Sequence, residues 1–268
     1  MIFAVGDIHG QLNMLEPALT RLTERLRPND AVIFLGDYID RGPDSEGVLR
    51  RLMRFKKQHP GTMFLRGNHE DLLLRSCDGD KRREELWLLN GGMATLASFG
   101  LGGNSNWRKK FPRWALDFLG ATHAAVKFTH FHFVHAGVVP YGVDTEVEPD
   151  LDARLWIRQP FIRHGDSPGR IVVFGHTPQP DHLPLIHMNK VGLDTGAGQR
   201  GGRLSVAGFD DELPRPRSPE FTLFQVCDDG TVTPDEYVRN VLRHLPQNEP
   251  TFRFSIPSIS SAPIIPTE

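Results

Sequence analysis

The chain has 268 residues and a mass of 30.2 kDa, which suits one large domain or two small ones. Hydrophobic residues make up 39% and charged residues 24%, an ordinary globular composition that excludes a mainly disordered or fibrous chain. The formal net charge of −2 provides no global positive field for nucleic acid or acidic membranes, so any anion binding must be local.

Short apolar runs near the start of the chain predict β-strands, each followed by a polar loop. The strands are expected at Ile2–Val5, Ala31–Leu35 and Thr62–Leu65. Apolar residues at helical spacing predict amphipathic helices between them, over Leu12–Leu26 and Val48–Phe55. Strand, loop and helix in succession are typical of βαβ units, whose right-handed crossovers give parallel strands with helices outside. The loops after such strands share one edge of the sheet, so residues distant in sequence converge there.

A helical, tryptophan-bearing stretch comes next and is expected to cap that edge. It runs from Arg82 to about Leu119 and is interrupted at Gly91-Gly92. The residues expected to pack are Trp87, Leu88, Leu89, Met93 and Leu96.

The rest of the chain predicts a second sheet and a C-terminal tail. Further strands are expected at Ala125–Phe128, Phe131–Val134, Ile171–Phe174, Leu185–Met188, Leu204–Phe209 and Phe221–Val226. The predicted fold is therefore α/β, a two-sheet β-sandwich flanked by helices, with its site at the carboxyl-terminal edge of the strands. Residues 1–243 would form the catalytic domain, with 82–119 as a helical insertion, and the Pro/Ser-rich residues 244–268 an extended or disordered tail.

Side chains that can bind metals follow the predicted strands at five places. They are Asp7 with His9, Asp37 with Asp40, Asn68 with His69, His135, and His176. One such residue after a strand is usually a turn or cap residue, but five placements on one sheet edge indicate a shared site. Carboxylate, imidazole and amide donors without a thiolate suit Mn²⁺, Fe or Zn²⁺ better than a structural zinc–sulfur cage.

Charge balance indicates what such a centre would bind. Two divalent cations carry four positive charges, and Asp7 and Asp37 would offset two of them. The remaining charge fits a phosphate dianion, and cations roughly 3.5–4 Å apart can hold a bridging hydroxide and polarise phosphoryl oxygens. Coordination lowers the pKa of bound water towards ~7, so no protein nucleophile is required.

Three neighbouring side chains could complete phosphate hydrolysis. Arg41 could grip phosphate oxygens in bidentate fashion, or it could only be the salt-bridge partner of the preceding carboxylates. Asp40 could ligate a cation or, as we prefer, orient His69. His69 would then protonate the leaving alkoxide, a general-acid step typically worth about 10²–10⁴-fold.

Five segments, in this order, resemble the signatures of the phosphoprotein phosphatases, a family of calcineurin-like metallophosphoesterases. They are Gly6–Gly10 (GDIHG), Gly36–Gly42 (GDYIDRG), Gly67–Glu70 (GNHE), Val134–Gly137 (VHAG) and Phe174–Pro178 (FGHTP). The resemblance covers about Met1 to Val226, and Gly192–Ala197 (GLDTGA) also resembles a segment of the bacterial members. It implies a calcineurin-like β-sandwich with a dinuclear metal centre.

Carried onto the matching positions, the resemblance implies two cation sites that share one carboxylate. Asp7, His9 and Asp37 would hold one cation, and Asp37, Asn68, His135 and His176 the other. The resemblance also makes His69 the general acid, Asp40 its partner and Arg41 a phosphate clamp, with Asn68 as a further phosphate contact.

A second phosphate-binding arginine is expected between the last two histidine segments. Arg158 is the candidate, with Arg154 and Arg163 as alternatives. The chain lacks the Ser-Ala-Pro-Asn-Tyr motif of eukaryotic members and has His-Ala-Gly where they have His-Gly-Gly, which puts the substrate groove in doubt. Symmetrical diadenosine tetraphosphate hydrolases resemble the pattern with Ala-Arg-Gly and Gly-Asn-His-Asp. Asp40–Gly42 and His69-Glu70 therefore favour the protein phosphatases.

The sequence thus predicts a bacterial-type serine/threonine protein phosphatase that uses two divalent cations, expected to be Mn²⁺ with Fe or Zn²⁺ as alternatives. Its partner would be a phosphoprotein or phosphopeptide substrate, with no nucleic acid and no membrane. One alternative is hydrolysis of diadenosine tetraphosphate or other small phosphate esters and anhydrides by the same cations. Another is a catalytically silent scaffold, against which the intact His69, His135 and His176 argue.

The cysteines and the N-terminal sequence predict a cytoplasmic protein. Cys77 and Cys227 are too few for a disulfide framework. The N-terminus lacks a basic segment followed by an apolar run and a small-residue cleavage site, and no stretch approaches the ~20 apolar residues of a membrane span.

Overall fold

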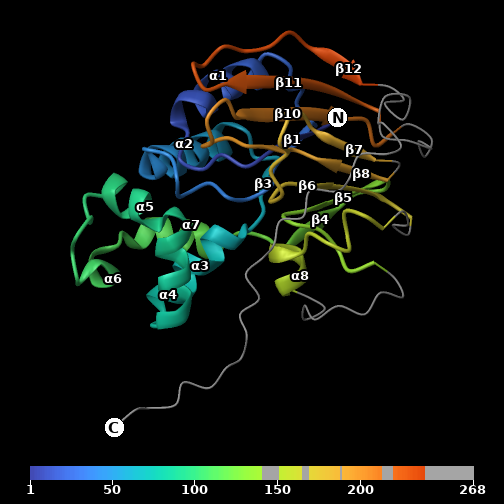
Figure 1. Cartoon of the computed structure of the whole chain (residues 1–268). Coiled ribbons are helices and arrows are strands. Elements are labelled where there is room, and N and C mark those ends of the chain that lie inside the picture. The colour runs from blue at the N-terminus through green and yellow to red at the C-terminus, as the bar shows by residue number, and fades with distance from the viewer. Residues whose placement is uncertain (141–150, 165–168, 188, 213–219, 239–268) are drawn as a thin grey trace.

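Two β-sheets packed face to face, with helices outside them, form the body of the protein (Figure 1). The computed structural model describes residues 1–140, 151–164, 169–187, 189–212 and 220–238. This arrangement confirms the α/β sandwich predicted from the sequence. The predicted tail, residues 244–268, lies outside the described residues.

The first sheet combines parallel and antiparallel strands in the order β12-β11-β10-β1-β2-β3, with β9 beside β10. Its strands are β1 Ile2–Val5, β2 Ala31–Phe34, β3 Thr62–Phe64, β9 Asp194–Thr195, β10 Arg203–Phe209, β11 Phe221–Cys227 and β12 Glu236–Val238. β1, β2 and β3 are parallel, as the βαβ pattern predicts. β10 runs antiparallel to β1, so late strands of the chain extend the first sheet.

The second sheet has the order β4-β5-β6-β8-β7. Its strands are β4 Ala125–Lys127, β5 Phe131–Val134, β6 Ile171–Phe174, β7 Leu185–His187 and β8 Lys190–Gly192. The sequence did not reveal β8, because it is short and begins with a lysine. Lys190 is nevertheless buried, and its Nζ donates to the carbonyl oxygen of Phe161 at 2.6 Å, which satisfies the ammonium group inside the fold.

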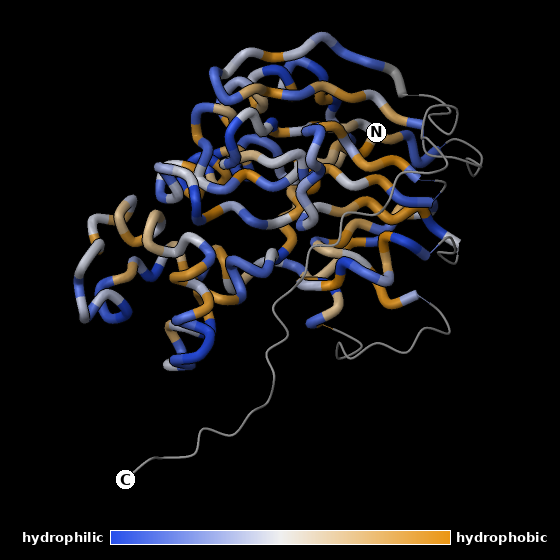
Figure 2. The backbone as a smooth tube through the Cα atoms, in the orientation of Figure 1, coloured by the Kyte–Doolittle hydropathy of each residue, from blue (hydrophilic) through white to orange (hydrophobic). Residues whose placement is uncertain are grey.

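Side-chain alternation along the strands builds a hydrophobic core on each face of the first sheet (Figure 2). Ile2 and Ala4 of β1 belong to the cluster between the two sheets. Phe3 and Val5 belong to the cluster under the helices. Because successive strand residues point to opposite faces, the short apolar run of β1 holds both layers together.

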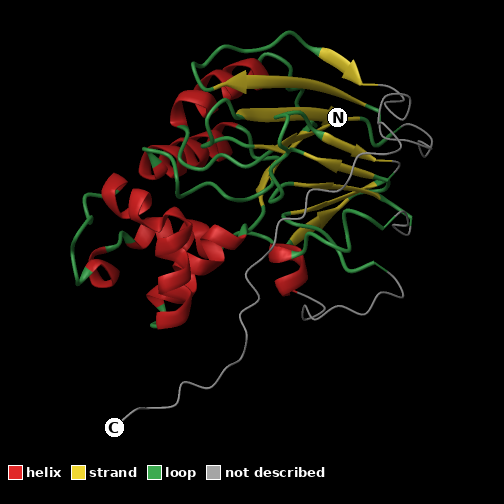
Figure 3. Ribbon diagram, viewed as in Figure 1, coloured by secondary structure: helices red, strands yellow, loops and turns green. Residues whose placement is uncertain are grey.

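Most of the helices form two groups, one over the first sheet and one beside the sandwich, and the last helix lies apart from both, near the second sheet (Figures 1 and 3). The helices are α1 Leu12–Thr23, α2 Ser45–Gln58, α3 Asn68–Cys77, α4 Lys81–Trp87, α5 Met93–Ser98, α6 Trp107–Lys110, α7 Arg113–Gly120 and α8 Leu151–Trp156, and the kinked segment Leu88–Gly92 joins α4 to α5. The segment from α4 to α7, called the helical layer below, occupies the stretch expected to cap the site; a capping role stays a prediction. None of the helices described combines the length and apolar character that a membrane crossing requires.

A kink at Gly91 changes which residues of the helical layer pack. Trp87 and Leu96 are buried, as predicted. The expectation that Leu89 and Met93 pack is wrong, since these residues are 85% and 50% exposed. Gly91 has a non-helical φ of 108°, so the helix is kinked there and α5 does not continue the helical repeat of α4. Apolar positions counted as one continuous helix across Gly91 are therefore out of phase.

Candidate metal centre

The loops after β1, β2, β3, β5 and β6 bring the predicted ligands into one buried cluster. Each of the following is 5% exposed or less: Asp7, His9, Asp37, Asn68, His135 and His176. Donor atoms of His9, Asp37 and His69 lie within 4.8 Å of one another, and so do those of Asp37, His135 and His176. The cluster therefore draws on both sheets, and Asp37 belongs to both groups.

The Asp37 carboxylate lies between the imidazoles of the two groups. Its Oδ2 is 3.6 Å from His9 Nε2, and its Oδ1 is 3.4 Å from His135 Nε2. Asp7 joins the cluster from the end of β1, where its Oδ2 accepts the backbone N–H of His176 at 3.0 Å. This places the Asp37 carboxylate where two cations could share it.

Backbone carbonyl groups decide which ring nitrogen of two histidines faces the cluster. His9 Nδ1 lies 3.0 Å from the carbonyl oxygen of Ile39, and His135 Nδ1 lies 2.8 Å from that of Leu35. A carbonyl oxygen can only accept, so each Nδ1 carries the hydrogen and each Nε2 presents a lone pair. This is the tautomer that a metal ligand needs.

Asn68 joins two imidazoles from the second sheet. Its Oδ1 lies 2.9 Å from His135 Nε2 and 2.8 Å from His176 Nδ1. Burial lowers the pKa of both histidines, which favours the neutral, metal-binding form. Buried carboxylate, amide and imidazole donors converge here without a thiolate, and such a set fits divalent Mn, Fe or Zn.

Electrostatics within the cluster favour the arrival of positive charge. Burial and repulsion from Asp194 and Asp37 raise the pKa of Asp7 well above its ordinary value. Burial would also raise the pKa of Asp37, but His135 and His69, with the other imidazoles, hold it below its ordinary value. Cations would relieve the repulsion between the carboxylates and keep them ionised.

The Asp40 carboxylate contacts His69 and belongs to neither of the two groups. Its Oδ2 lies 2.7 Å from His69 Nδ1. It also accepts the indole N–H of Trp87 at 2.9 Å and the hydroxyl of Thr95 at 2.6 Å. Burial alone would lower the pKa of His69, but Asp37 and Asp40 raise it. Of the two roles considered for Asp40, the geometry supports orientation of His69.

Arg41 and Arg158 are exposed residues whose guanidinium groups reach over the buried imidazoles. Arg41 Nη1 lies 2.7 Å from His9 Nε2, and Nη2 lies 3.1 Å from His69 Nε2. Arg158 Nε donates to His176 Nε2 at 3.3 Å. Within the described part of the chain neither arginine forms an ion pair with a carboxylate, so the salt-bridge role considered for Arg41 is not seen there. Both guanidinium groups can donate to an anion above the cluster.

The loops of the cluster have an unusual backbone. Positive φ values between 47° and 73° occur at His9, Asp37, Asp40, Arg41 and His176. Such a conformation costs about 1–3 kcal/mol per residue, so surrounding contacts must impose it. The Glu70 carboxylate supplies several of these, because it accepts the backbone N–H groups of Asp37 at 2.8 Å, Tyr38 at 2.9 Å and Gly67 at 2.8 Å.

Sequence reasoning missed the residues that hold the predicted site residues in place. Glu70 lies in a segment that the resemblance singled out, but no role was assigned to it. The contact of Thr95 with Asp40 spans 55 positions, and nothing in the sequence indicates it. Asp194 is 2% exposed beside the cluster, and its only signal was the Gly192–Ala197 segment.

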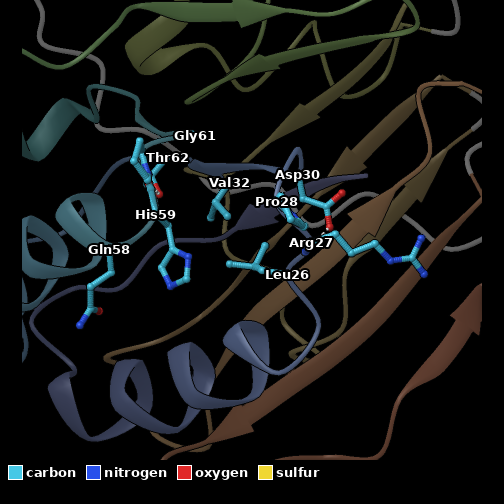
Figure 4. A pocket seen from close by; sticks show the side chains of 10 residues that line it. Leu26, Arg27, Pro28, Asp30, Val32, Gln58, His59, Gly61 and Thr62 are labelled. Atoms are coloured by element: carbon cyan, nitrogen blue, oxygen red, sulfur yellow. Dashed lines mark hydrogen bonds between the residues drawn. The ribbon is translucent and has the colours of Figure 1, made fainter.

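A separate pocket of about 290 Å³ lies at the opposite end of the strands of the first sheet (Figure 4). Its lining residues are Leu26, Arg27, Pro28, Asp30, Val32, Gln58, His59, Pro60, Gly61 and Thr62. They surround the amino ends of β2 and β3, whereas the metal-binding residues follow the carboxyl ends. Asp30 there pairs with the N-terminal ammonium group at 2.8 Å, and none of the lining residues belongs to the two groups of the candidate metal centre.

Comparisons with known proteins give a family and two enzyme relatives. Residues 1–213 match the family described as calcineurin-like phosphoesterase. The chain is 32% identical over 224 residues to serine/threonine-protein phosphatase 1 of Salmonella typhimurium, covering 77% of this chain and 90% of the relative. It is 28% identical over 235 residues to an asymmetrical bis(5'-nucleosyl)-tetraphosphatase of Oceanobacillus iheyensis, covering 78% of this chain and 88% of that enzyme.

Solved structures give the same fold. The crystal structure of a cold-active protein-tyrosine phosphatase of a psychrophilic Shewanella species superimposes with a TM-score of 0.55. The match covers 89% of this chain and 80% of the other at 18% sequence identity, so it supports the architecture and not the substrate.

Proposed function

Because the chain belongs to the calcineurin-like phosphoesterase family of metal-dependent hydrolases, we propose that it dephosphorylates phosphoserine and phosphothreonine in proteins. One observation carries this proposal, namely the buried His69–Asp40 pair beside the metal cluster, with a distance of 2.7 Å between Nδ1 and Oδ2. The leaving alkoxide of a serine or threonine ester is strongly basic and needs a proton, which this pair could deliver.

We propose that two divalent cations bind at the cluster. Asp7, His9 and Asp37 would hold one, and Asp37, Asn68, His135 and His176 the other. Such cations supply an activated water molecule and polarise the phosphoryl group. Mn²⁺ is our first expectation for the metal, with Fe and Zn²⁺ as alternatives, because the donors are oxygen and nitrogen atoms only.

The protein's own residues would bind the phosphate and move the proton. Arg41 and Arg158 extend over the imidazoles from opposite groups, so they can grip phosphate oxygens between them. Asn68 could contribute a further contact from within the cluster. With Nδ1 of His69 hydrogen-bonded to Asp40, Nε2 is the nitrogen that lies beside Arg41, the residue proposed to bind phosphate, and it would hold the proton for the leaving group.

A second candidate function is hydrolysis of dinucleoside tetraphosphates, since one relative carries that activity in its name. Cleavage of such an anhydride releases a phosphate group, a weaker base than an alkoxide. A buried proton donor is therefore needed less for an anhydride than for a phosphoserine ester. This difference favours the protein phosphatase.

A substrate panel with added Mn²⁺ tests the proposal. Rates are compared on a phosphoserine or phosphothreonine peptide, a phosphotyrosine peptide, p-nitrophenyl phosphate and diadenosine tetraphosphate. We expect the phosphoserine or phosphothreonine peptide to have the highest kcat/KM. Much faster turnover of diadenosine tetraphosphate would reverse the preference, and absence of metal-stimulated hydrolysis of every phosphomonoester would support a silent scaffold.

A further inference from the structure

Asp194 is fixed at the junction between the two sheets, next to the metal cluster. The preceding residue, Leu193, donates its backbone N–H to the carbonyl oxygen of Phe174 at 2.7 Å, at the end of β6. The carbonyl oxygen of Leu193 packs against Gly6, where an added Cβ would approach it to 2.3 Å. The loops that follow Gly6 and Phe174 carry Asp7 and His176, so Asp194 is held beside both ligand loops.

Among the described residues, one oxygen of the Asp194 carboxylate has no hydrogen-bond partner. Oδ1 accepts the backbone N–H of Gly196 at 3.0 Å. Oδ2 is buried and makes no hydrogen bond to any residue that the structure describes, although the side chain is only 2% exposed. Leaving a buried polar group unpaired typically costs about 1–3 kcal/mol, and more when the group is charged. We therefore expect a bound ligand to supply a hydrogen-bond donor to Oδ2 of Asp194.

The charges around Asp194 indicate which kind of donor this is. Asp194 is the carboxylate that contributes most to raising the pKa of Asp7, and Asp37 also repels it. Arg41 and Arg158 attract it without reaching ion-pair distance. A phosphate dianion would be repelled by Asp194, whereas a cation and the water molecules on it would be attracted.

The segment that follows Asp194 covers the side of the cluster formed by His9. Gly198, with φ of 87°, lies so close that an added Cβ would be 3.2 Å from the Cβ of His9 and 3.7 Å from that of Arg41. The Asp194 segment therefore lies against the same group of ligands that contains His9.

We propose that Asp194 is a positioning residue of the metal centre, whose free Oδ2 accepts a hydrogen bond from water on the cation beside Asp7. It also places a third carboxylate, after Asp7 and Asp37, on that side of the centre. Outer carboxylates of this kind commonly tune metal affinity about 10–100-fold. The inference rests on the metal dependence within the proposed function and not on the identity of the substrate.

The test compares wild type with Asp194→Asn after metal removal, using Mn²⁺ alone as the probe. Asparagine keeps the shape and can still accept from Gly196, but it removes the charge. Asp117→Asn serves as control, because Asp117 is an exposed aspartate of α7 that pairs with Arg113. Calorimetric titration gives the affinity of each Mn²⁺ site, and thermal unfolding gives the Tm with and without Mn²⁺.

We expect metal-free Asp194→Asn to melt at or above the wild-type Tm, because repulsion with Asp7 is gone. One Mn²⁺ site should weaken at least about 10-fold while the other is unchanged, and the Tm gain on adding Mn²⁺ should shrink. Wild-type affinity at both sites of the variant would overturn the inference, whatever the Tm of its metal-free form. If the wild type binds no Mn²⁺, both this inference and the metal dependence of the proposed function are wrong.

A second variant covers the case in which Asp194→Asn does not fold. In Asp194→Ser the hydroxyl can still accept from Gly196, and the charge is again removed. The same titration applies, and a Ser variant with unweakened Mn²⁺ sites would contradict the proposal.

Discussion

The β-sandwich and the helical layer contribute to the candidate site in different ways. Strand ends of the two sheets present the side chains that converge on Asp37, from His9 on one side and His135 on the other. The helical layer presents no metal-binding side chain of the two groups and instead contacts Asp40 and Arg41. Metal binding and the handling of proton and phosphate should therefore be separable by mutation.

Asp40 and Arg41 lie at the boundary between these two regions. The loop that carries them begins in the first sheet, but its Asp40 accepts from Trp87 and Thr95 of the helical layer. The backbone N–H of Arg41 donates to the carbonyl oxygen of Gly91 at 3.3 Å. The kink at Gly91 thus supports Arg41, the residue that we expect to grip phosphate.

The largest effect is expected on the sandwich side, from Asp37→Asn. Losing the carboxylate shared by both groups should empty the centre and lower activity by roughly 10³-fold or more, since metal stabilisation is worth several kcal/mol. Metal analysis of the purified variant and its rate on p-nitrophenyl phosphate provide the measurement. Asp71→Asn is the control, because Asp71 is a buried aspartate of α3 that pairs with Arg75 instead. If the Asp37→Asn protein keeps both cations, the proposal that Asp37 is a ligand of both is wrong.

His69→Asn should separate the two regions most clearly. We expect both cations to stay bound while kcat on a phosphothreonine peptide falls by about 10²–10⁴-fold, because the proton donor is lost. The loss should be smaller on p-nitrophenyl phosphate, whose leaving group needs less protonation. His130→Asn, at the turn before β5, serves as control. If His69→Asn instead releases a cation, His69 belongs among the ligands, next to which it lies.

Asp40→Asn should act through the pH dependence. Asp37 and Asp40 raise the pKa of His69 against the lowering effect of burial, so His69 keeps its proton to higher pH than it otherwise would. A general acid works only while protonated, so kcat should fall as pH rises through the pKa of His69. Removing the Asp40 charge should move this alkaline limb to lower pH and reduce activity by about 10–100-fold. A pH–rate profile measures the shift, and an unmoved alkaline limb would speak against the pairing.

The clustering of the candidate ligands on the sandwich could be predicted from the sequence, whereas the residues that support them could not. Asp7, Asp37 and Asn68 each follow a short apolar run, and the carboxyl ends of parallel strands meet at one edge. No sequence pattern indicates the role of Thr95, because its partner Asp40 lies 55 positions away and the contact forms only in the folded protein. The sequence showed the interruption at Gly91-Gly92 but not the direction of the kink there, so it did not indicate that Leu89 is exposed.

The smallest effect, and the most specific to the helical layer, is expected from Trp87→Phe. The indole N–H of Trp87 donates to both oxygens of Asp40, at 3.1 and 2.9 Å, while its ring packs inside the layer. Phenylalanine fills most of the space but removes a hydrogen bond to a charged group, a loss of about 1.5–3 kcal/mol of unfolding free energy. Asp40 retains Thr95 and His69, so kcat should fall only up to about 10-fold, with both cations bound.

Trp107→Phe provides the matched control for this variant. Trp107 is a buried tryptophan of the same layer, but its indole N–H donates to Glu84 at 3.1 Å and not to Asp40. Denaturant unfolding should show a loss of stability in both variants, whereas kcat should fall only in Trp87→Phe. An equal fall of kcat in both would mean that the layer acts through overall stability. Because Trp87 contacts the Asp40 carboxylate and Trp107 contacts Glu84, the difference in kcat between the two variants measures how much the helical layer contributes to orienting His69.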